Sequence, residues 1–220
     1  MDSPKLAALD WNGTTLNDRN SAWRGIKAIF NHYQIQAPQA DNFFDSSQPD
    51  YLPVYHQHGI PKHASKDDLN KIWQRHYGDY TSDGQLREGV IELLEFLKNL
   101  GIKTAIISAE FGPVLEKRLN QLELRELLDL AWGDCLDKSL ALAKAANELG
   151  IPAAKVIYVD DNYHGLIQAK ATKVITVGFT GGWQSPSKIS QANPDFLASN
   201  FYEVRQVVET LRNLQEQGAT

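Results

Sequence analysis

Residues 6–16, Leu-Ala-Ala-Leu-Asp-Trp-Asn-Gly-Thr-Thr-Leu, decide the fold of this chain. The first four are apolar, as in a buried strand, and Asp10 follows them directly. Gly13 comes three positions later, where a turn is expected. Ligands of open α/β sheets bind beyond the carboxyl ends of the strands, so we expect Asp10 at a ligand-binding edge. A carboxylate in this position can act as a nucleophile and carry a covalent intermediate.

From residue 84 onward, apolar runs and amphipathic stretches alternate. We expect strands at 103–107, 128–132, 155–159 and 173–177, and a weaker one near Phe196. Helices are expected at 90–100, 113–122, 138–149, 163–171 and 202–215, the first and third closed by Gly101 and Gly150. This alternation predicts a Rossmann-like α/β fold, with a parallel sheet and helices on both faces.

Residues 17–82 interrupt this alternation. A helix is expected at 17–33 with Asn20 or Ser21 as its cap, and another after Ser65. The stretch 36–64 between them contains four prolines and shows no sustained period. We therefore expect a small helical cap at 17–82, inserted into an α/β core formed by 1–16 and 83–220.

The overall composition suits a cytoplasmic protein with its own hydrophobic core. The 220 residues are 42% hydrophobic and carry a formal net charge of −5, so no basic footprint points to nucleic acid. No apolar run has the length of a membrane span, and we expect no membrane association. The single cysteine, Cys135, cannot form an internal disulfide and suits a reducing compartment.

Polar residues follow three of the expected strands. They are Asp10, Ser108, and the pair Asp160 and Asp161. Because parallel strands end at the same edge of a sheet, we expect these side chains to lie together. Asp10 would be the nucleophile of a phosphoryl transfer, and Asp160 or Asp161 would help to hold magnesium, which prefers oxygen ligands.

The same edge offers groups that can bind a phosphate. The hydroxyl of Ser108 and the backbone N–H of Ala109 can donate hydrogen bonds to phosphoryl oxygens. Lys138, at the start of an expected helix, can neutralise phosphate charge and restrain the nucleophile. Catalysis of phosphoryl transfer depends mostly on such positioning and electrostatics.

Four stretches now stand in order: Asp-Trp-Asn-Gly-Thr-Thr-Leu at 10–16, Ile-Ile-Ser at 106–108, Lys138, and Tyr-Val-Asp-Asp at 158–161. In this order they resemble the motifs of the haloacid dehalogenase superfamily, over nearly the whole chain. The resemblance implies a hydrolase whose Asp10 becomes an aspartyl-phosphate, acting on a small phosphorylated metabolite. It also implies that 17–82 is a C1-type helical cap of the phosphoglycolate phosphatase-like branch.

The resemblance further implies a set of magnesium ligands. These are a side-chain oxygen of Asp10, the backbone carbonyl of Asn12, and Asp161, with Asp160 in a place more often held by glycine. Ser108 and Lys138 correspond to the phosphate-binding pair. The fourth motif often has another acid four residues after the metal ligand, where this chain has Gly165. We expect Asp160 to compensate for it.

Asn12 is the largest departure from the superfamily pattern. Phosphatases of the superfamily usually have a second aspartate there, which protonates the leaving oxygen and later deprotonates the attacking water. An amide can do neither, and losing this help typically costs about 10²–10⁴ in rate. Ordinary phosphomonoesters should therefore react slowly, and aryl or acyl phosphates should suffer least. Restoring the acid by Asn12→Asp is expected to raise the rate about tenfold or more.

Two other functions stay open at this point. Phosphonoacetaldehyde hydrolases also lack the second aspartate, and a phosphonatase-like hydrolase would need a cap lysine such as Lys62, Lys66 or Lys71. A catalytically impaired phosphate-binding protein would keep the fold without turnover. The presence of Asp10, Ser108, Lys138 and Asp161 together argues against it.

Several other residues attract attention in the proposed cap. His56, His58 and His63 have no regular spacing and no nearby cysteine, so they are a weak candidate for a transition-metal site. We expect the substrate side of the cap to be formed by Tyr55, His56, His58, Lys62, Trp73, Arg75 and His76. The loop Gly181-Gly182-Trp183 either approaches the site or forms a plain surface turn.

Overall fold

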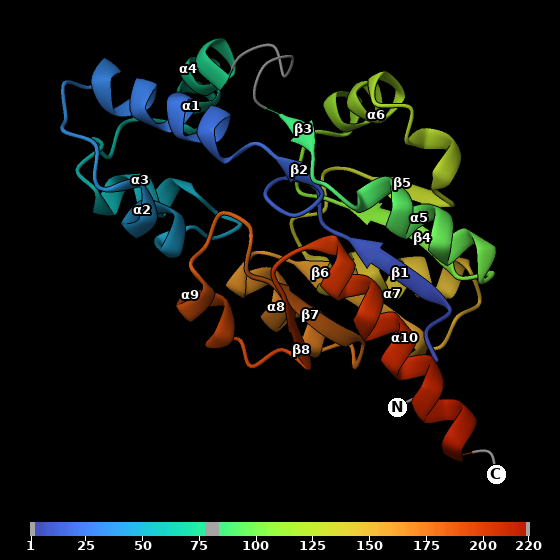
Figure 1. Cartoon of the computed structure of the whole chain (residues 1–220). Coiled ribbons are helices and arrows are strands. Elements are labelled where there is room, and N and C mark those ends of the chain that lie inside the picture. The colour runs from blue at the N-terminus through green and yellow to red at the C-terminus, as the bar shows by residue number, and fades with distance from the viewer. Residues whose placement is uncertain (1–2, 78–83, 219–220) are drawn as a thin grey trace.

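The computed structural model describes residues 3–77 and 84–218. At its centre is a six-stranded parallel sheet with the order β5-β4-β1-β6-β7-β8 (Figure 1). The strands are β1 (Leu6–Leu9), β4 (Lys103–Ile107), β5 (Leu130–Trp132), β6 (Val156–Asp160), β7 (Ile175–Phe179) and β8 (Phe196–Ala198). The central strand β1 has β4 on one side and β6 on the other. The three expected polar strand ends are therefore neighbours in space.

Helices cover both faces of the sheet, which confirms the predicted Rossmann-like α/β class. One face packs against α5 (Val90–Asn99), α6 (Gly112–Gln121) and α10 (Phe201–Gly218). The other packs against α7 (Lys138–Glu148) and α8 (Tyr163–Lys170). Along β1, Ala7 and Leu9 face the first layer and Leu6 and Ala8 face the second. This double burial explains the continuous apolar run of the sequence.

The helical block consists of α1 (Arg19–His32), α2 (Ala40–Ser46), α3 (Leu52–Gln57) and α4 (Lys66–Tyr77), and it lies beside the sheet (Figure 1). It has an aromatic core of its own, built around Phe30, Phe43, Phe44 and Tyr55. Trp23 and Trp73 pack against this core. The helices α2 and α3 were not predicted, because helices of seven and six residues are too short to show a period in the sequence. The division into a core and an inserted cap stays a prediction.

A few short elements complete the fold. An antiparallel pair, β2 (Leu16–Asn17) and β3 (Gln85–Leu86), joins the two ends of the block to the sheet domain. The helix α9 (Pro186–Ser190) lies between β7 and β8, and 3₁₀ turns occur at Arg125–Leu127 and Ala153–Lys155.

The starts of two helices test the capping residues expected from the sequence. Ser65 and Asp68 form a reciprocal capping box at the start of α4, as Ser65 predicted. The expected cap of α1 at Asn20 or Ser21 is wrong, because α1 begins at Arg19 after Asp18. The Asp18 side chain makes no cap bond to this helix, since it is used elsewhere in the structure.

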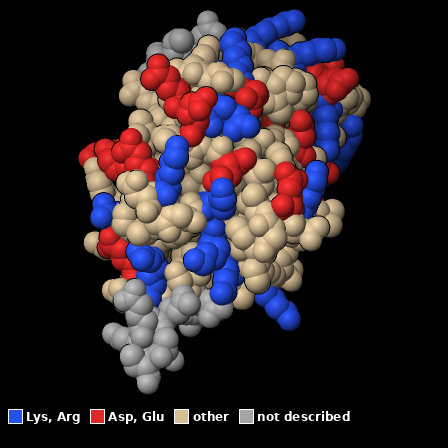
Figure 2. All heavy atoms as spheres, turned by 90° about the vertical axis from the view of Figure 1, so that its right-hand side faces the viewer, with Lys and Arg blue, Asp and Glu red and all other residues tan. Residues whose placement is uncertain are grey.

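Surface charge is mixed. Figure 2 shows basic and acidic side chains interleaved over one face of the molecule, so this face carries no extended field of a single sign. Among the residues that the structure describes, no helix combines the length and the apolar character needed to cross a bilayer.

Candidate active site

Asp10 and Lys138 form a buried ion pair at the end of the central strand. The Nζ of Lys138 lies 2.7 Å from Oδ1 of Asp10 and also donates to the backbone carbonyl of Ile107 at 2.7 Å. Asp10 follows β1 directly, and Lys138 is the first residue of α7, whose N-cap is Asp137. The sequence predicted both partners, and the structure brings them together across 128 positions.

Two more carboxylates join Asp10. Asp160 ends β6 and Asp161 follows it, and both side chains are almost completely buried. One carboxylate oxygen from each of Asp10, Asp160 and Asp161 lies within 4.8 Å of the other two. The predicted acidic cluster is therefore present as a geometric unit.

Asp161 is held by neighbours that approach it unusually closely. Its Oδ1 accepts from the Thr14 hydroxyl at 2.7 Å, and its Oδ2 accepts from the backbone N–H of Trp183 at 2.6 Å. A Cβ at Gly13 would lie 2.3 Å from Asp161 Oδ2, and a Cβ at Gly182 would lie 2.2 Å from Asp161 Cβ. Glycine at these two positions lets the backbone close around the carboxylate. The loop at 181–183 thus approaches the site and is not a plain surface turn.

Asp160 points to a different set of partners. Its Oδ2 accepts from the Tyr158 hydroxyl at 2.7 Å, and its Oδ1 accepts from the backbone N–H of Asn162 at 2.9 Å. A Cβ at Gly165 would lie only 1.9 Å from Asp160 Oδ2. The Asp160 carboxylate therefore fills the space next to Gly165, where the family pattern often has an acid.

Burial and mutual repulsion change the acidity of these groups. Burial, with the charge of Asp10 as the second cause, raises the pKa of Asp161 to about 7. The same two causes, in the same order, raise the pKa of Asp160 well above its ordinary value. The Lys138 ammonium acts in the opposite direction on Asp160. If all three carboxylates were ionised, the single Lys138 ammonium would not neutralise them, and the excess negative charge would be buried.

This arrangement fits a hard divalent cation. Carboxylate oxygens are the ligands that magnesium prefers, and each oxygen has lone pairs beyond those used in the hydrogen bonds above. A cation would also offset the repulsion that raises the acid pKa values. The described residues thus supply a suitable donor set.

Ser108 lies at the end of the neighbouring strand, as predicted. Its side chain is buried, its Oγ accepts from the backbone N–H of Glu110 at 3.0 Å, and its own N–H donates to the carbonyl of Trp132. It does not cap α6, which begins at Gly112 after Phe111. Ala109, the next residue, is exposed.

Asn12 belongs to a network centred on Asp18. The Nδ2 of Asn12 lies 2.9 Å from Asp18 Oδ2, 3.2 Å from the Tyr77 hydroxyl oxygen and 3.4 Å from Glu110 Oε2. Asp18 is fully buried and also accepts from the backbone N–H of Gly13, from the Tyr77 hydroxyl and from the indole N–H of Trp183. The network connects the first motif, the end of α4 and the loop after β7.

Sequence reasoning missed Asp18 and Arg87. The guanidinium of Arg87 donates twice to the carbonyl of Gly13, at 3.0 and 2.8 Å, and fixes the turn after Asp10. In the sequence, Arg87 is marked only by an Arg-Glu-Gly stretch just before an expected helix. Such a stretch does not by itself indicate a functional residue. Asp18 was hidden because an acid before a helix is usually interpreted as a cap.

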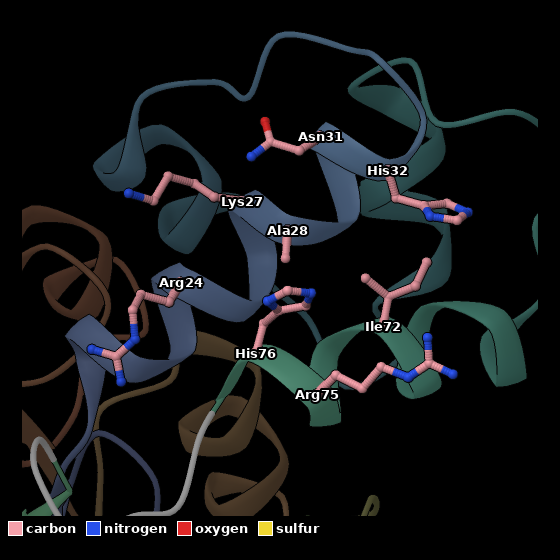
Figure 3. A pocket seen from close by; sticks show the side chains of 8 residues that line it. All are labelled: Arg24, Lys27, Ala28, Asn31, His32, Ile72, Arg75 and His76. Carbon is pink, nitrogen blue, oxygen red and sulfur yellow. The ribbon is translucent and has the colours of Figure 1, made fainter.

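The prediction of which residues form the substrate side of the helical block is wrong in part. Tyr55 is buried in the aromatic core, and the His58 ring lies 5.5 Å from the ring of Phe43 in the same core. His56 faces the carbonyl of Ile60 at 3.0 Å. Arg75 and His76 line a groove of about 570 Å³ between α1 and α4 (Figure 3). The other residues around this groove are Arg24, Lys27, Ala28, Asn31, His32 and Ile72.

Comparison with known proteins relates the chain to phosphatases at modest identity. It is 31% identical over 131 residues to a phosphoglycolate phosphatase of Neisseria meningitidis, a match that covers 56% of each protein. A phosphoglycolate phosphatase of Synechococcus elongatus is 29% identical over 140 residues, covering 63% of this chain and 66% of that protein. The matches thus span less than two thirds of these relatives.

Solved structures show the same fold. A predicted phosphoglycolate phosphatase from Haemophilus somnus superposes with a TM-score of 0.75 at 20% identity, covering 94% of this chain and 99% of that one. A predicted phosphatase from Clostridium acetobutylicum gives a TM-score of 0.78 at 15% identity with the same coverage.

The family model described as haloacid dehalogenase-like hydrolase matches residues 8–179, which include the end of the first strand, Asp10, Ser108, Lys138 and the acidic pair. The match covers most of the chain and agrees with the motif order and with the sheet. This protein belongs to the haloacid dehalogenase-like hydrolase family.

Proposed function

We propose that this protein is a magnesium-dependent phosphatase that forms an aspartyl-phosphate on Asp10. The observation that carries the proposal is the Asp10–Lys138 pair at 2.7 Å, set among two further buried carboxylates. A surface acid would not need a buried lysine and a carboxylate cluster, whereas a phosphoryl acceptor needs both charge neutralisation and fixed orientation.

Each residue has a role that follows from its position. Asp10 attacks phosphorus with the oxygen that is not paired to Lys138, and the bond from phosphorus to the leaving oxygen breaks. Lys138 holds the nucleophile and neutralises a phosphoryl oxygen. The Ser108 hydroxyl and the Ala109 N–H donate to phosphoryl oxygens at the neighbouring strand end. Water then releases phosphate from Asp10.

Magnesium would be held by Asp10, by Asp161 and by the backbone carbonyl of Asn12, with Asp160 beside them. When bound, this ion supplies positive charge for the phosphoryl oxygens. Thr14 and Trp183 orient Asp161 for that role, and Tyr158 orients Asp160.

We propose small phosphorylated metabolites as the substrate class. The relatives named above are phosphoglycolate phosphatases, and the family match includes Asp10, Ser108 and Lys138. The helical block beside the strand ends would restrict access to compounds of modest size.

The test is phosphate release from a panel of phosphate compounds, with and without magnesium, in the wild type and in Asp10→Asn. We expect metal-dependent release that is lost in the variant, and a phosphorylated protein that appears only in the wild type. Equal release by both proteins would contradict the proposal. Asp134→Asn serves as the matched control, because Asp134 lies outside the carboxylate cluster and accepts from the N–H of Gly112.

A further inference from the structure

The side-chain amide nitrogen of Asn12 faces hydrogen-bond acceptors. Its Nδ2 has three oxygen neighbours, at 2.9, 3.2 and 3.4 Å, and two of them belong to the carboxylates of Asp18 and Glu110. The third is the Tyr77 hydroxyl, whose proton is directed to Asp18 at 2.5 Å. A group at position 12 must therefore donate hydrogen bonds to fit this environment.

An acid at position 12 would not fit in the same way. Its carboxylate would face the fully buried Asp18 carboxylate, and two like charges at this separation cannot both stay ionised. A protonated carboxyl group at position 12 would donate to Asp18, so its proton would be directed away from a substrate. The acceptors around position 12 thus favour an amide over an acid there, so the replacement of the acid involves the neighbouring residues as well.

Glu110 is the other carboxyl group near Asn12. Its Oε1 accepts from the backbone N–H of Phe111 at 3.0 Å, and its Oε2 is the acceptor for Asn12. Each oxygen of Glu110 therefore accepts a hydrogen bond from a nitrogen of the protein, and these two contacts direct no proton toward a substrate. Asn12 is an amide and has no acidic proton to donate to a leaving oxygen.

From this we infer the substrate class: a phosphate compound whose leaving oxygen departs without a proton, namely an acyl phosphate. The inference rests on the proposed function and deepens it. A carboxylate leaves readily as an anion, whereas an alkoxide requires the general acid that position 12 lacks.

The chemistry balances without an acid at position 12. An oxygen of Asp10 forms a bond to phosphorus while the bond between phosphorus and the acyl oxygen breaks, and the leaving group departs as a free carboxylate. Water then attacks phosphorus, the bond to Asp10 breaks, and both protons of that water end on the released dihydrogen phosphate. The aspartyl-phosphate is itself an acyl phosphate, so its own breakdown also needs no protonated leaving group.

The test compares leaving groups of increasing basicity on the intact protein with magnesium. The probes are acetyl phosphate, p-nitrophenyl phosphate, phenyl phosphate and the alkyl ester 2-phosphoglycolate. We expect kcat/KM to fall steadily along this series and to be about 10² or more lower for the alkyl ester than for acetyl phosphate. Asp10→Asn should abolish all four activities, which tests the proposed function separately from the leaving-group dependence.

A double variant tests directly whether the lack of an acid at position 12 limits the reaction of alkyl esters. Asn12→Asp combined with Asp18→Asn exchanges donor and acceptor, so that the new acid faces an amide. We expect the ratio of the alkyl-ester rate to the acetyl phosphate rate to rise about tenfold or more over that of the wild type. Wild-type magnesium binding by the double variant would confirm that it is folded, and an unchanged ratio in the folded variant would count against the inference.

Three further results would overturn the inference. One is an alkyl ester that reacts as fast as acetyl phosphate in the wild type. Another is a Glu110→Gln variant that selectively loses the alkyl ester, because Glu110 would then be the acid. The last is a wild type that releases phosphate in an Asp10-dependent way but does not accept acetyl phosphate, in which case the proposed function stands and the substrate class fails.

Discussion

The carboxylate of Asp160 occupies the space that a side chain at Gly165 would need. A Cβ at position 165 would lie 1.9 Å from Asp160 Oδ2. The acid at the end of β6 therefore requires a glycine five residues later, so the two substitutions depend on each other. The carboxylate reaches the cluster from the strand end, and α8 leaves room for it.

We predict that Gly165→Ala displaces the Asp160 carboxylate and lowers magnesium affinity about tenfold or more, as expected when a group that supports a metal site is lost. Isothermal titration with magnesium measures this effect. The double variant Asp160→Gly with Gly165→Asp exchanges the two residues and should bind magnesium nearly as well as wild type. Equal affinity of Gly165→Ala and wild type would show that Asp160 has no part in the site.

Lys138→Met should lower kcat/KM by about 10²–10³, the usual cost of removing one electrostatic stabiliser from a preorganised site. The matched control is Lys144→Met on the same helix. Its ammonium lies 4.7 Å from the ring centroid of Trp132 and not against Asp10. The assignment would be wrong if both variants lost the same activity.

The raised pKa of Asp161, about 7 without metal, predicts a pH-dependent stability. Between about pH 4 and pH 7 the folded protein retains a proton that the unfolded chain has lost, so stability decreases as pH rises, by up to about 1.4 kcal/mol per pH unit from this group. Chemical denaturation in a chelator at several pH values measures the slope. Asp161→Asn should reduce the slope, and magnesium should raise stability most at the upper end of this range. A slope unchanged in Asp161→Asn would assign the effect to other groups.

Asp18 should be the most costly polar residue to remove. Asp18→Ala removes the acceptor shared by the side chains of Asn12, Tyr77 and Trp183 and by the backbone N–H of Gly13, and we expect a loss of about 3–5 kcal/mol in the free energy of unfolding. Tyr77→Phe should lose about 1–3 kcal/mol. Tyr202→Phe is its control, because that hydroxyl bonds Glu88 at the surface and should matter little. Similar losses for the two tyrosines would argue against a central role for Asp18.

The single variant Asn12→Asp separates two effects. The sequence predicts a gain in rate of about tenfold or more, and the structure adds the repulsion between the new carboxyl and Asp18. We expect a lower melting temperature and a smaller gain on alkyl esters than in the double variant with Asp18→Asn. Asn31→Asp, at an exposed position of α1, controls for the change of charge. A full gain in the single variant would mean that Asp18 does not restrain the acid.

The strand ends were predictable because buried parallel strands are continuous apolar runs that end on polar residues. Asp10, Ser108 and the Asp160–Asp161 pair were found this way, and the structure places them at neighbouring strand ends. Lys138 was found as the polar residue that opens α7. The class of fold followed from the alternation of these strands with helices.

The remaining parts of the site depend on contacts between distant segments, which periodicity does not report. Asp18 meets Tyr77 across 59 positions and Trp183 across 165. The helices α2 and α3 form because their aromatic residues pack into the core of the block and not because of local propensity. For the same reason Tyr55 and His58 resembled exposed recognition residues in the sequence, whereas Tyr55 is a core residue and the half-buried ring of His58 packs against Phe43 of that core.

Trp183 has a consequence beyond the geometry of the site. Its backbone N–H binds Asp161 and its indole N–H binds Asp18, so a single residue contacts both the proposed metal site and the attachment of the helical block. A displacement of the block that pulls on the indole would also disturb Asp161. Thermodynamic reciprocity then requires that any effect of this contact on magnesium affinity be matched by an equal effect of magnesium on the attachment of the block.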